Sequence, residues 1–497
     1  MNMLAAPVMI EDEEFDPFAA GALERVIQTT EAQREVWLAS QLGAQASLAY
    51  NESVALHLDG VIDAAALRAA LARLVARHES LRATFSADGL QLMIAQAGHF
   101  EVALHELSGS DAQTRLAQAR LDAVETPFDL ESGPLFRAAL YRLSAQQHVL
   151  LMTAHHAVCD GWSWGVICQD LGRLYAEATH TGPALDAPAS YSDYIAWERA
   201  EAASPEMQAH LAFWLGRFAG GALPALELPL DRPRAPVRGF ASRRVDVELD
   251  AALVESVRKV GAGLGASLFA TLFSLFAATI HRLAQQEDLV IGVPSAGQSV
   301  SDMPHLVGHC VNLLPIRVSV DSRMSLESLV RGSSSMLLDA FEHQTLTYGS
   351  LLKQLPLPRD PSRPSLVSVM FNLDRDDGTG DEIFPGLRTK VSSNPRHFEN
   401  FELFLNVVPI DGGLRLELQY GTALFDEATV LRWLTLYRTA LERFVRQPDL
   451  AVAQALAPSE QDRALLAAFN ATGAPFDRHA RIDALVARQA AATPDAP

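Results

Sequence analysis

The sequence predicts an α/β protein, because strand-like runs and helix-like stripes both occur along it. Residues 148–154 form a short apolar run that is typical of a buried strand. Residues 54–58 carry apolar side chains at alternate positions, as on a half-buried strand. Residues 67–75 instead place leucine and valine every three or four positions, on one face of a helix. A mixture of this kind favours a fold in which helices cover sheets.

The first half of the chain supplies the elements of one lobe. Asp63 stands where a helix N-cap is expected, just before the stripe at 67–75. Residues 135–143 predict a strand next to the one at 148–154. Asp160 and Gly161 then predict a turn, because this dipeptide favours reversal of the chain. The leucine and isoleucine spacing after that turn predicts another helix.

The second half repeats this pattern after a proline-rich connector at 228–236. It predicts strands near 243–249 and 289–293, a helix over 268–283, and a helix that Asp426 caps. From the N-terminus, we expect a flexible leader at 1–27, an N-terminal lobe at 28–205, a C-terminal lobe at 206–455, and a tail at 456–497 where the apolar periodicity fades.

Bulk properties exclude some classes of protein. A length of 497 residues exceeds one ordinary core and predicts two or three units. The net charge of −20 argues against general nucleic-acid binding, so a site for an anionic partner must be a local basic patch. No apolar run approaches the roughly 18 residues that span a bilayer, and the first ten residues lack a signal-peptide pattern. We expect a cytoplasmic monomer without membrane association.

His155 and His156 carry the clearest chemical signal, in the segment His-His-Ala-Val-Cys-Asp-Gly at 155–161. Imidazole exchanges protons near neutral pH, which a general base requires. A pair at the end of a buried strand, above a turn, is held rigidly at the surface of a cleft. The alternative is a hydrogen-bonded core histidine beside an ordinary turn. Cys159 in the same segment offers a nucleophile, but the three cysteines have neither disulfide nor metal-ligand spacing, so no metal site is expected.

A series of segments in a fixed order resembles the condensation domains of nonribosomal peptide synthetases. The matching segments are Thr30–Leu38, Arg77–Phe85, His155–Ser163, Tyr191–Trp197, Val307–Arg317 and Arg359–Arg363. Together they span roughly residues 28–455. One segment departs from the family pattern: His343-Gln344 is followed by Thr-Leu-Thr-Tyr-Gly, which we expect to alter the tunnel wall or the acyl preference.

The resemblance implies two chloramphenicol-acetyltransferase-like lobes that form a V-shaped pseudo-dimer with a central tunnel. It implies that the domain joins a donor acyl thioester (fatty acyl, polyketide or peptidyl) to the amine of an aminoacyl thioester. The donor is held by an acyl or peptidyl carrier protein, or arrives as acyl-CoA; a peptidyl carrier protein holds the acceptor. The phosphopantetheine arms belong to those partners, so this chain is expected to bind no cofactor of its own.

The resemblance also implies roles for individual residues. His156 is expected to be catalytic, as general base or as a group that positions the amine, and the Gly161 N–H to stabilise the oxyanion. His155 is expected to support the strand end. Asp160 is expected to form a buried ion pair with Arg77, or failing that with Arg82. Trp162 and Ser163 are expected near the tunnel or substrate, and Asn312 either faces the tunnel or fixes the backbone.

The tail and the start of the chain widen the range of interpretations. Residues 469–472 and 491–497 resemble the linker and opening residues of an adenylation domain, so we expect such a domain downstream. If Met1 is the natural start, the donor arrives in trans, as for a starter domain in lipopeptide synthesis. The alternatives are an epimerisation domain, a non-catalytic recruitment platform of the same fold, and an acyltransferase that uses a soluble thioester. The segment Val307–Arg317 favours the condensing interpretation over epimerisation, and the intact histidine pair and Asp-Gly favour it over the recruitment platform.

Overall fold

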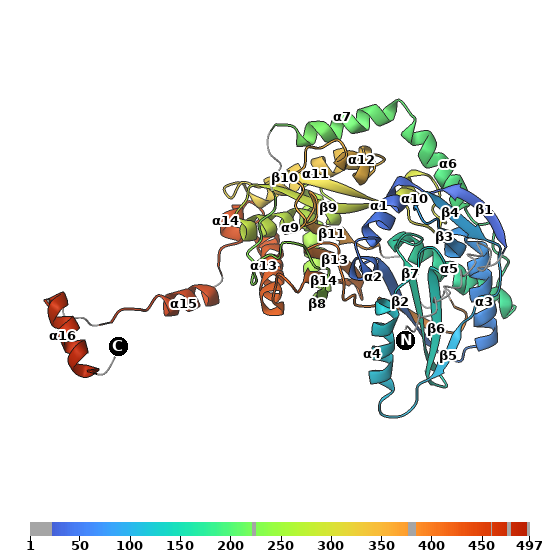
Figure 1. Ribbon diagram of the computed structural model, residues 1–497, viewed down its shortest axis with the longest axis horizontal. Coiled ribbons are helices and arrows are strands. Elements are labelled where there is room, and N and C mark those ends of the chain that lie inside the picture. The colour runs from blue at the N-terminus through green and yellow to red at the C-terminus, as the bar shows by residue number, and fades with distance from the viewer. Residues whose placement is uncertain (1–21, 221–224, 376–383, 459, 475–478, 495–497) are drawn as a thin grey trace, which may run out of the picture. The chain divides into compact units, whose positions relative to one another are not determined.

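The computed structural model describes residues 22–220, 225–375, 384–458, 460–474 and 479–494 (Figure 1). The chain divides into two compact units, Met1–Ala455 and Leu456–Pro497. The leader predicted at 1–27 lies outside the described residues up to position 21. Within the rest of this predicted segment, Leu23–Gln28 form a strand that pairs with Gln91–Ala95. This pairing covers the exposed edge of the partner strand.

The first half of the larger unit contains, in order, β1 (Leu23–Gln28), α1 (Glu31–Ser40), α2 (Ala44–Leu48), β2 (Asn51–Asp59), α3 (Ala64–Arg77), the 3₁₀ helix η1 (Glu79–Arg82), β3 (Ala83–Phe85), β4 (Gln91–Ala95), β5 (Ala103–Glu106), α4 (Ala112–Glu125), β6 (Phe136–Ser144), β7 (Gln147–His155), α5 (Gly161–Ala178), α6 (Tyr191–Ala202) and α7 (Glu206–Phe218).

The second half contains, in order, β8 (Ser242–Leu249), α8 (Ala251–Gly263), α9 (Leu268–Ala284), β9 (Asp288–Ala296), α10 (Gly297–Val300), β10 (Val311–Ser319), α11 (Leu326–Glu342), α12 (Tyr348–Leu352), β11 (Val369–Leu373), β12 (Arg388–Ser393), β13 (Leu403–Ile410), β14 (Gly413–Gly421), α13 (Glu427–Arg446) and α14 (Val452–Ala455). Each strand and helix predicted in this half is present.

The first lobe is built on a five-stranded sheet of order β12-β2-β7-β6-β5 (Figure 1). Its central strands expose opposite faces to different helices, because successive side chains of a strand alternate. Leu56 of β2 packs with α3 and α5, whereas the neighbouring Ala55 packs with α4. Asp63 caps α3 as predicted, since its carboxylate accepts from Ala65 and Ala66 N–H. The strand that carries the histidine pair is thereby buried in the middle of this lobe.

The second lobe is built on a six-stranded sheet of order β10-β9-β11-β13-β14-β8. Helix α9 is buried over most of its length beside this sheet, and Tyr437 of α13 donates to its Leu272 carbonyl at 3.0 Å. Helix α13 begins after Asp426 as predicted, but the Asp426 carboxylate pairs with Arg232 and makes no capping bond.

One strand from the second half of the chain joins the sheet of the first lobe, so the expected boundary between residues 205 and 206 does not separate the two lobes completely. Strand β12 lies within 206–455, yet it pairs antiparallel with β2 of the first lobe, from Arg388–Asp59 to Ser393–Val54. This pairing covers the edge of β2, and β12 becomes the outer strand of the five-stranded sheet. The pairing also places the loop that follows β12 beside β2, the strand that pairs with β7.

The described residues of the smaller unit form the helices α15 (Glu460–Phe469) and α16 (Ile482–Ala492). These segments are helical although the apolar periodicity fades after residue 456. Alanine and leucine have the strongest helix propensity, so they form helices without a regular buried stripe. Among the described residues, no single helix has the length and hydropathy to cross a bilayer, and α8 and α9 meet that test only as a pair bent by 98°.

Candidate active site

A cavity of about 1170 Å³ lies between elements of the two lobes in the larger unit. Its lining includes five of the residues that the sequence singled out: His156, Asp160, Gly161, Trp162 and Asn312. Four others do not line it: His155, Ser163, Arg77 and Arg82. Four residues of the local motif therefore reach the cavity together, whereas His155, Ser163 and the two arginines do not.

His156 is held with one ring nitrogen fixed. Its Nδ1 lies 2.7 Å from the Cys159 carbonyl oxygen, and its backbone N–H donates to the Tyr50 carbonyl at 2.7 Å. A carbonyl oxygen only accepts, so Nδ1 carries the proton and Nε2 of the neutral ring keeps its lone pair. The ring lines the cavity and is half-buried. This arrangement presents the basic nitrogen of His156 for proton exchange.

His155 is placed differently, although it is the adjacent residue. It is fully buried, and its Nδ1 accepts from the Ala157 N–H at 3.2 Å. Burial, together with the neighbouring His156, lowers the pKa of His155 to about 3, so this ring is neutral at physiological pH. The expectation that His155 supports the strand end agrees with this position, because alternation of β7 turns its side chain away from the cavity lining.

The expected ion pair between Asp160 and Arg77 or Arg82 is wrong. Asp160 is buried, and its carboxylate accepts from Ser163 N–H at 2.9 Å, from Gln298 Nε2 at 3.0 and 3.1 Å, and from Cys310 N–H at 3.0 Å. Ser163 Oγ lies 2.7 Å from the same carboxylate. Neutral donors alone can hold a buried carboxylate when there are enough of them. Asp160 therefore fastens the start of α5 to segment 298–310 of the second half.

The two arginines serve other contacts. Arg77 Nε donates to Asp170 at 2.8 Å, and His78 Nε2 lies 3.1 Å from the same carboxylate. Arg82 pairs with Glu24 of β1 at 2.8 Å. Both arginines thus tie surface and core elements of the first lobe together, and neither reaches Asp160.

Gly161 is the first residue of α5 and lines the cavity. A Cβ built at this position meets nothing within 4 Å, so the space beside it is open. The first N–H groups of a helix have no partner within the helix, and they carry the positive end of its dipole. The Gly161 N–H is therefore chemically suited to a developing oxyanion, as the sequence suggested.

Replacement of Gly161 by alanine tests this open space directly. We expect Gly161→Ala to fold at least as stably as the parent, because alanine has the higher helix propensity and the added methyl group meets no neighbour. We expect activity to fall about tenfold or more, because the methyl group occupies space beside the reacting carbonyl. Gly263→Ala at the end of α8, where a Cβ also meets nothing, is the matched control. Unchanged turnover by Gly161→Ala would remove Gly161 from the site.

Trp162, Ser163 and Asn312 link the motif to the second half. Trp162 Nε1 donates to the Pro304 carbonyl at 2.8 Å, and the Arg375 guanidinium lies 4.3 Å from its ring centre. Ser163 Oγ accepts from the Gly308 N–H at 3.0 Å. Asn312 lines the cavity and also fixes the backbone: its Nδ2 donates to the Gln344 and Leu346 carbonyls, both at 2.8 Å. Both roles expected of Asn312 are thus present together.

His309 is a cavity residue that the sequence reasoning did not select. Its ring meets that of His156 edge to face, with centroids 4.8 Å apart. Burial, and then the proximity of His156, lowers the pKa of His309, so it stays neutral. Its position inside the segment Val307–Arg317 was the available signal. Burial likewise raises the pKa of the Cys159 thiol, which disfavours the thiolate that a cysteine nucleophile needs.

Glu35 of α1 is another cavity residue outside the predicted set. It accepts from the Gly349 N–H of α12 at 2.7 Å, and burial raises its pKa to about 7. A carboxyl with a raised folded pKa keeps its proton while the unfolded chain loses one. Its contribution to stability is therefore lost as pH rises from about 4.5 through 7.

We expect Glu35→Gln to gain stability relative to the parent over that pH interval, by at most about 3 kcal/mol, because glutamine keeps the bond from Gly349 without the charge. Urea unfolding of both proteins at several pH values measures the difference. The control variant Glu101→Gln, at an exposed position, should not gain stability specifically within this pH interval. A pH-independent difference for Glu35→Gln would contradict the raised pKa.

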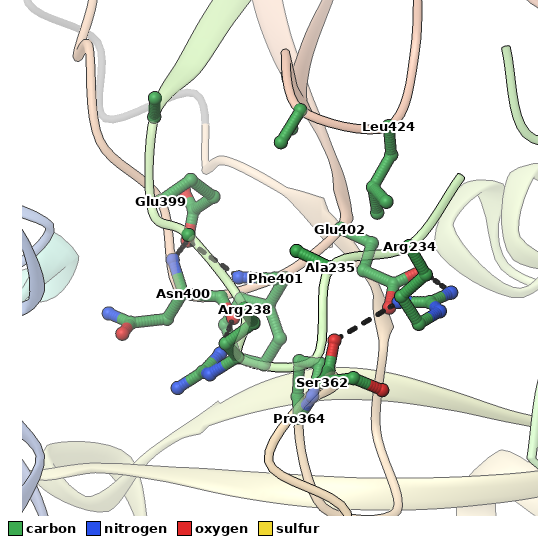
Figure 2. Close-up of a pocket in the computed structure, with 14 residues that line it drawn as sticks. Arg234, Ala235, Arg238, Ser362, Pro364, Glu399, Asn400, Phe401, Glu402 and Leu424 are labelled. Atoms are coloured by element: carbon green, nitrogen blue, oxygen red, sulfur yellow. Dashed lines mark hydrogen bonds and ion pairs between the residues drawn. The ribbon is translucent and has the colours of Figure 1, made fainter. Parts of the chain in front are cut away.

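A second, much smaller cavity of about 40 Å³ lies near the connector (Figure 2). Figure 2 shows Arg234 in a two-pronged contact with Glu402, and Arg238 directed toward Asn400, whose carbonyl it contacts. None of the nine candidate site residues that the sequence singled out lines this space, which is also too small for an acyl group. The large cavity is therefore the candidate site.

Comparison with known proteins agrees with this geometry. The family model described as "Condensation domain" matches residues 23–467. Chondramide synthase cmdD of Chondromyces crocatus is 31% identical over 479 residues, which are 95% of this chain and 12% of that protein. Malpinin synthetase of Mortierella alpina is 30% identical over 471 residues, which are 94% of this chain and 6% of that protein. The chain thus spans a small part of these relatives.

Solved structures show the same fold. The condensation domain of the monacolin K polyketide synthase MokA superposes with a TM-score of 0.78 at 18% identity, over 87% of this chain and 100% of that one. The starter condensation domain of rhizomide synthetase RzmA, in complex with C8-CoA, superposes with a TM-score of 0.75 at 23% identity, over 86% of this chain and 96% of that one. The X-domain from teicoplanin biosynthesis superposes with a TM-score of 0.75 at 25% identity, over 88% of this chain and 99% of that one. The two-lobed chloramphenicol-acetyltransferase-like fold, the motif at the cavity and the family match agree, and the chain belongs to the condensation domain family.

Proposed function

We propose that this domain forms an amide bond between a donor acyl thioester and the amine of an aminoacyl thioester on a carrier protein. The observation that carries the proposal is His156 in the cavity, with Nδ1 held by the Cys159 carbonyl and Nε2 left basic. An amine that attacks a thioester must shed a proton as the tetrahedral intermediate forms. The Nε2 atom of His156 is the group that can receive it.

The chemistry balances without another reactant. A C–N bond forms as the amine adds to the thioester carbonyl, and the oxyanion faces the Gly161 N–H. The C–S bond then breaks, and the leaving thiolate takes up the proton that the amine lost. His156 either transfers this proton or orients the amine and stabilises the intermediate; positioning alone supplies several kcal/mol. The phosphopantetheine arms remain on the carrier partners and are substrate, not cofactor.

The donor in this proposal is delivered by an acyl or peptidyl carrier, or as acyl-CoA as in the rhizomide starter domain. A peptidyl carrier delivers the acceptor, and an adenylation domain downstream loads it, as the multidomain architecture of the relatives suggests. A starter role in lipopeptide synthesis belongs to the same proposal. We propose that the domain works as a cytoplasmic monomer.

Intact-mass spectrometry tests the proposal. An acceptor carrier loaded with an aminoacyl group is incubated with this domain and with candidate donors, and its mass is followed. We expect a mass increase equal to the donor acyl group that depends on His156. Absence of product with every donor class, combined with tight carrier binding, would favour the recruitment platform, a role that the complex of the teicoplanin X-domain with OxyB illustrates for that protein. Product with a soluble amine alone would indicate a simple acyltransferase.

A further inference from the structure

Part of one wall of the large cavity is polar. It is formed by side chains of the second-lobe sheet, at alternate positions that place them on the same face. The polar residues of this group are Arg244 on β8, Asn372 and Asp374 at and beyond the end of β11, Asn406 on β13, and Arg415, Glu417 and Gln419 on β14. Phe404 and Val408 of β13 line the same cavity, so polar and apolar side chains share this wall.

Most of the charges on this wall are already paired. Glu417 accepts from Arg244 at 2.9 Å and from Arg415 at 2.6 Å. Glu52 of β2, on the neighbouring part of the lining, pairs with Arg396 at 3.0 Å. These groups satisfy one another and need no substrate to complete them.

Asp374 is the exception. Its carboxylate accepts from two neutral amides, Asn372 Nδ2 at 2.8 Å and Asn406 Nδ2 at 2.9 Å. No lysine or arginine among the described residues lies within ion-pair distance of it. Burial, with Glu417 and Glu52 of the same sign nearby, raises its pKa to about 6. Within the part of the chain that the structure describes, this cavity carboxylate thus has two amide donors and no countercharge.

The Asp374 carboxylate lines the same cavity as the motif residues. The next residue, Arg375, stacks on Trp162, which directly follows Gly161 in α5. A group bound at Asp374 is therefore within the same enclosed space as the reacting thioester. The side-chain amides of Asn372 and Asn406 fix the direction from which a further hydrogen-bond donor can approach Asp374, because both carboxylate oxygens are already oriented by hydrogen bonds.

We propose that Asp374, held by Asn372 and Asn406, recognises a primary ammonium group on an acyl substrate of this domain. The proposal rests on the proposed function and names its substrate class. An ammonium group supplies the missing countercharge and further donors. An alkyl chain in the same place would instead bury the Asp374 carboxylate without a countercharge, which costs free energy. The ammonium group is either the α-amine of an aminoacyl group or a basic side chain, and the test separates these two sources.

Binding of unreactive analogues tests the proposal without turnover. Amide analogues of N-acetylcysteamine thioesters are titrated into the domain by calorimetry, at about pH 7, where a carboxyl with a pKa of about 6 is mostly ionised and an α-ammonium group is mostly protonated. The octanoyl analogue carries no ammonium group, the N-acetyl-lysyl analogue carries only a side-chain ammonium, and the alanyl analogue only an α-ammonium. We expect one ammonium analogue to bind roughly 10- to 100-fold more tightly than octanoyl, since charged hydrogen bonds contribute at that level.

Variants at Asp374 then assign that preference. Asp374→Asn and Asp374→Ala should each remove the preference for the ammonium analogue and leave octanoyl binding unchanged or tighter. Asp449→Asn, exposed after α13, should behave as the parent. Octanoyl binding as tight as both ammonium analogues, or an ammonium preference that survives in both Asp374 variants, would overturn the proposal. Amide formation in the mass assay tests the proposed function separately. The proposed function and the role of Asp374 can therefore fail independently of each other.

Discussion

Replacing His156 with alanine is expected to lower the rate of amide formation by about 100-fold to 10,000-fold, while the fold stays intact. The side chain is half-buried at a cavity wall, so its removal exposes little new core. The expected loss follows from the usual contribution of a positioned proton acceptor. Single-turnover rates with a loaded acceptor carrier measure the effect, and His99→Ala at an exposed position is the control.

The pH profile of the residual activity separates the two roles left open for His156. If the ring is the general base, the parent rate falls as the ring becomes protonated, and the alanine variant loses that dependence. If the ring only positions the amine, both proteins share one profile and differ by a constant factor. A folded His156→Ala domain with parental rates would remove His156 from the mechanism altogether.

The second large effect is expected at Asp160 and concerns stability. Asp160→Ala removes the acceptor for donors from Ser163, Gln298 and Cys310, which are buried with it. Buried donors left without partners cost about 1–3 kcal/mol each, so we expect a loss of about 3 kcal/mol or more in urea unfolding. Asp160→Asn should lose less, because the Gln298 Oε1 atom, buried without a partner, can turn to accept from the new amide.

A double-mutant cycle checks the correction to the Asp160 pairing. Asp160→Asn and Arg77→Ala should have additive effects, because the two side chains share no partner. Asp170→Asn and Arg77→Ala should couple, because their side chains meet at 2.8 Å. Coupling of the first pair would restore the ion pair that the structure does not show. An Asp160 variant that unfolds like the parent but is inactive would indicate a direct chemical role.

Patterns among neighbouring residues were enough to predict the local parts of this protein. His156, Asp160 and Gly161 lie within six consecutive residues, so one strand end and one helix start fix their relative positions. The strand at 148–154 and the helices at 268–283 and after Asp426 were predictable because periodic burial is written in adjacent residues. The family resemblance was visible for the same reason, because each matching segment is a run of neighbouring residues.

Contacts between distant residues became known only from the packed fold. Asp160 and Arg77 looked like partners because a buried carboxylate usually needs a cation, but Gln298 and Cys310 supply neutral donors instead. No local pattern predicts that His309 meets His156, that β12 crosses to β2, or that Asp374 is left without a countercharge. These contacts depend on how the sheets pack, because hydrogen bonds and ion pairs act over a few ångströms in space and carry no signal along the chain.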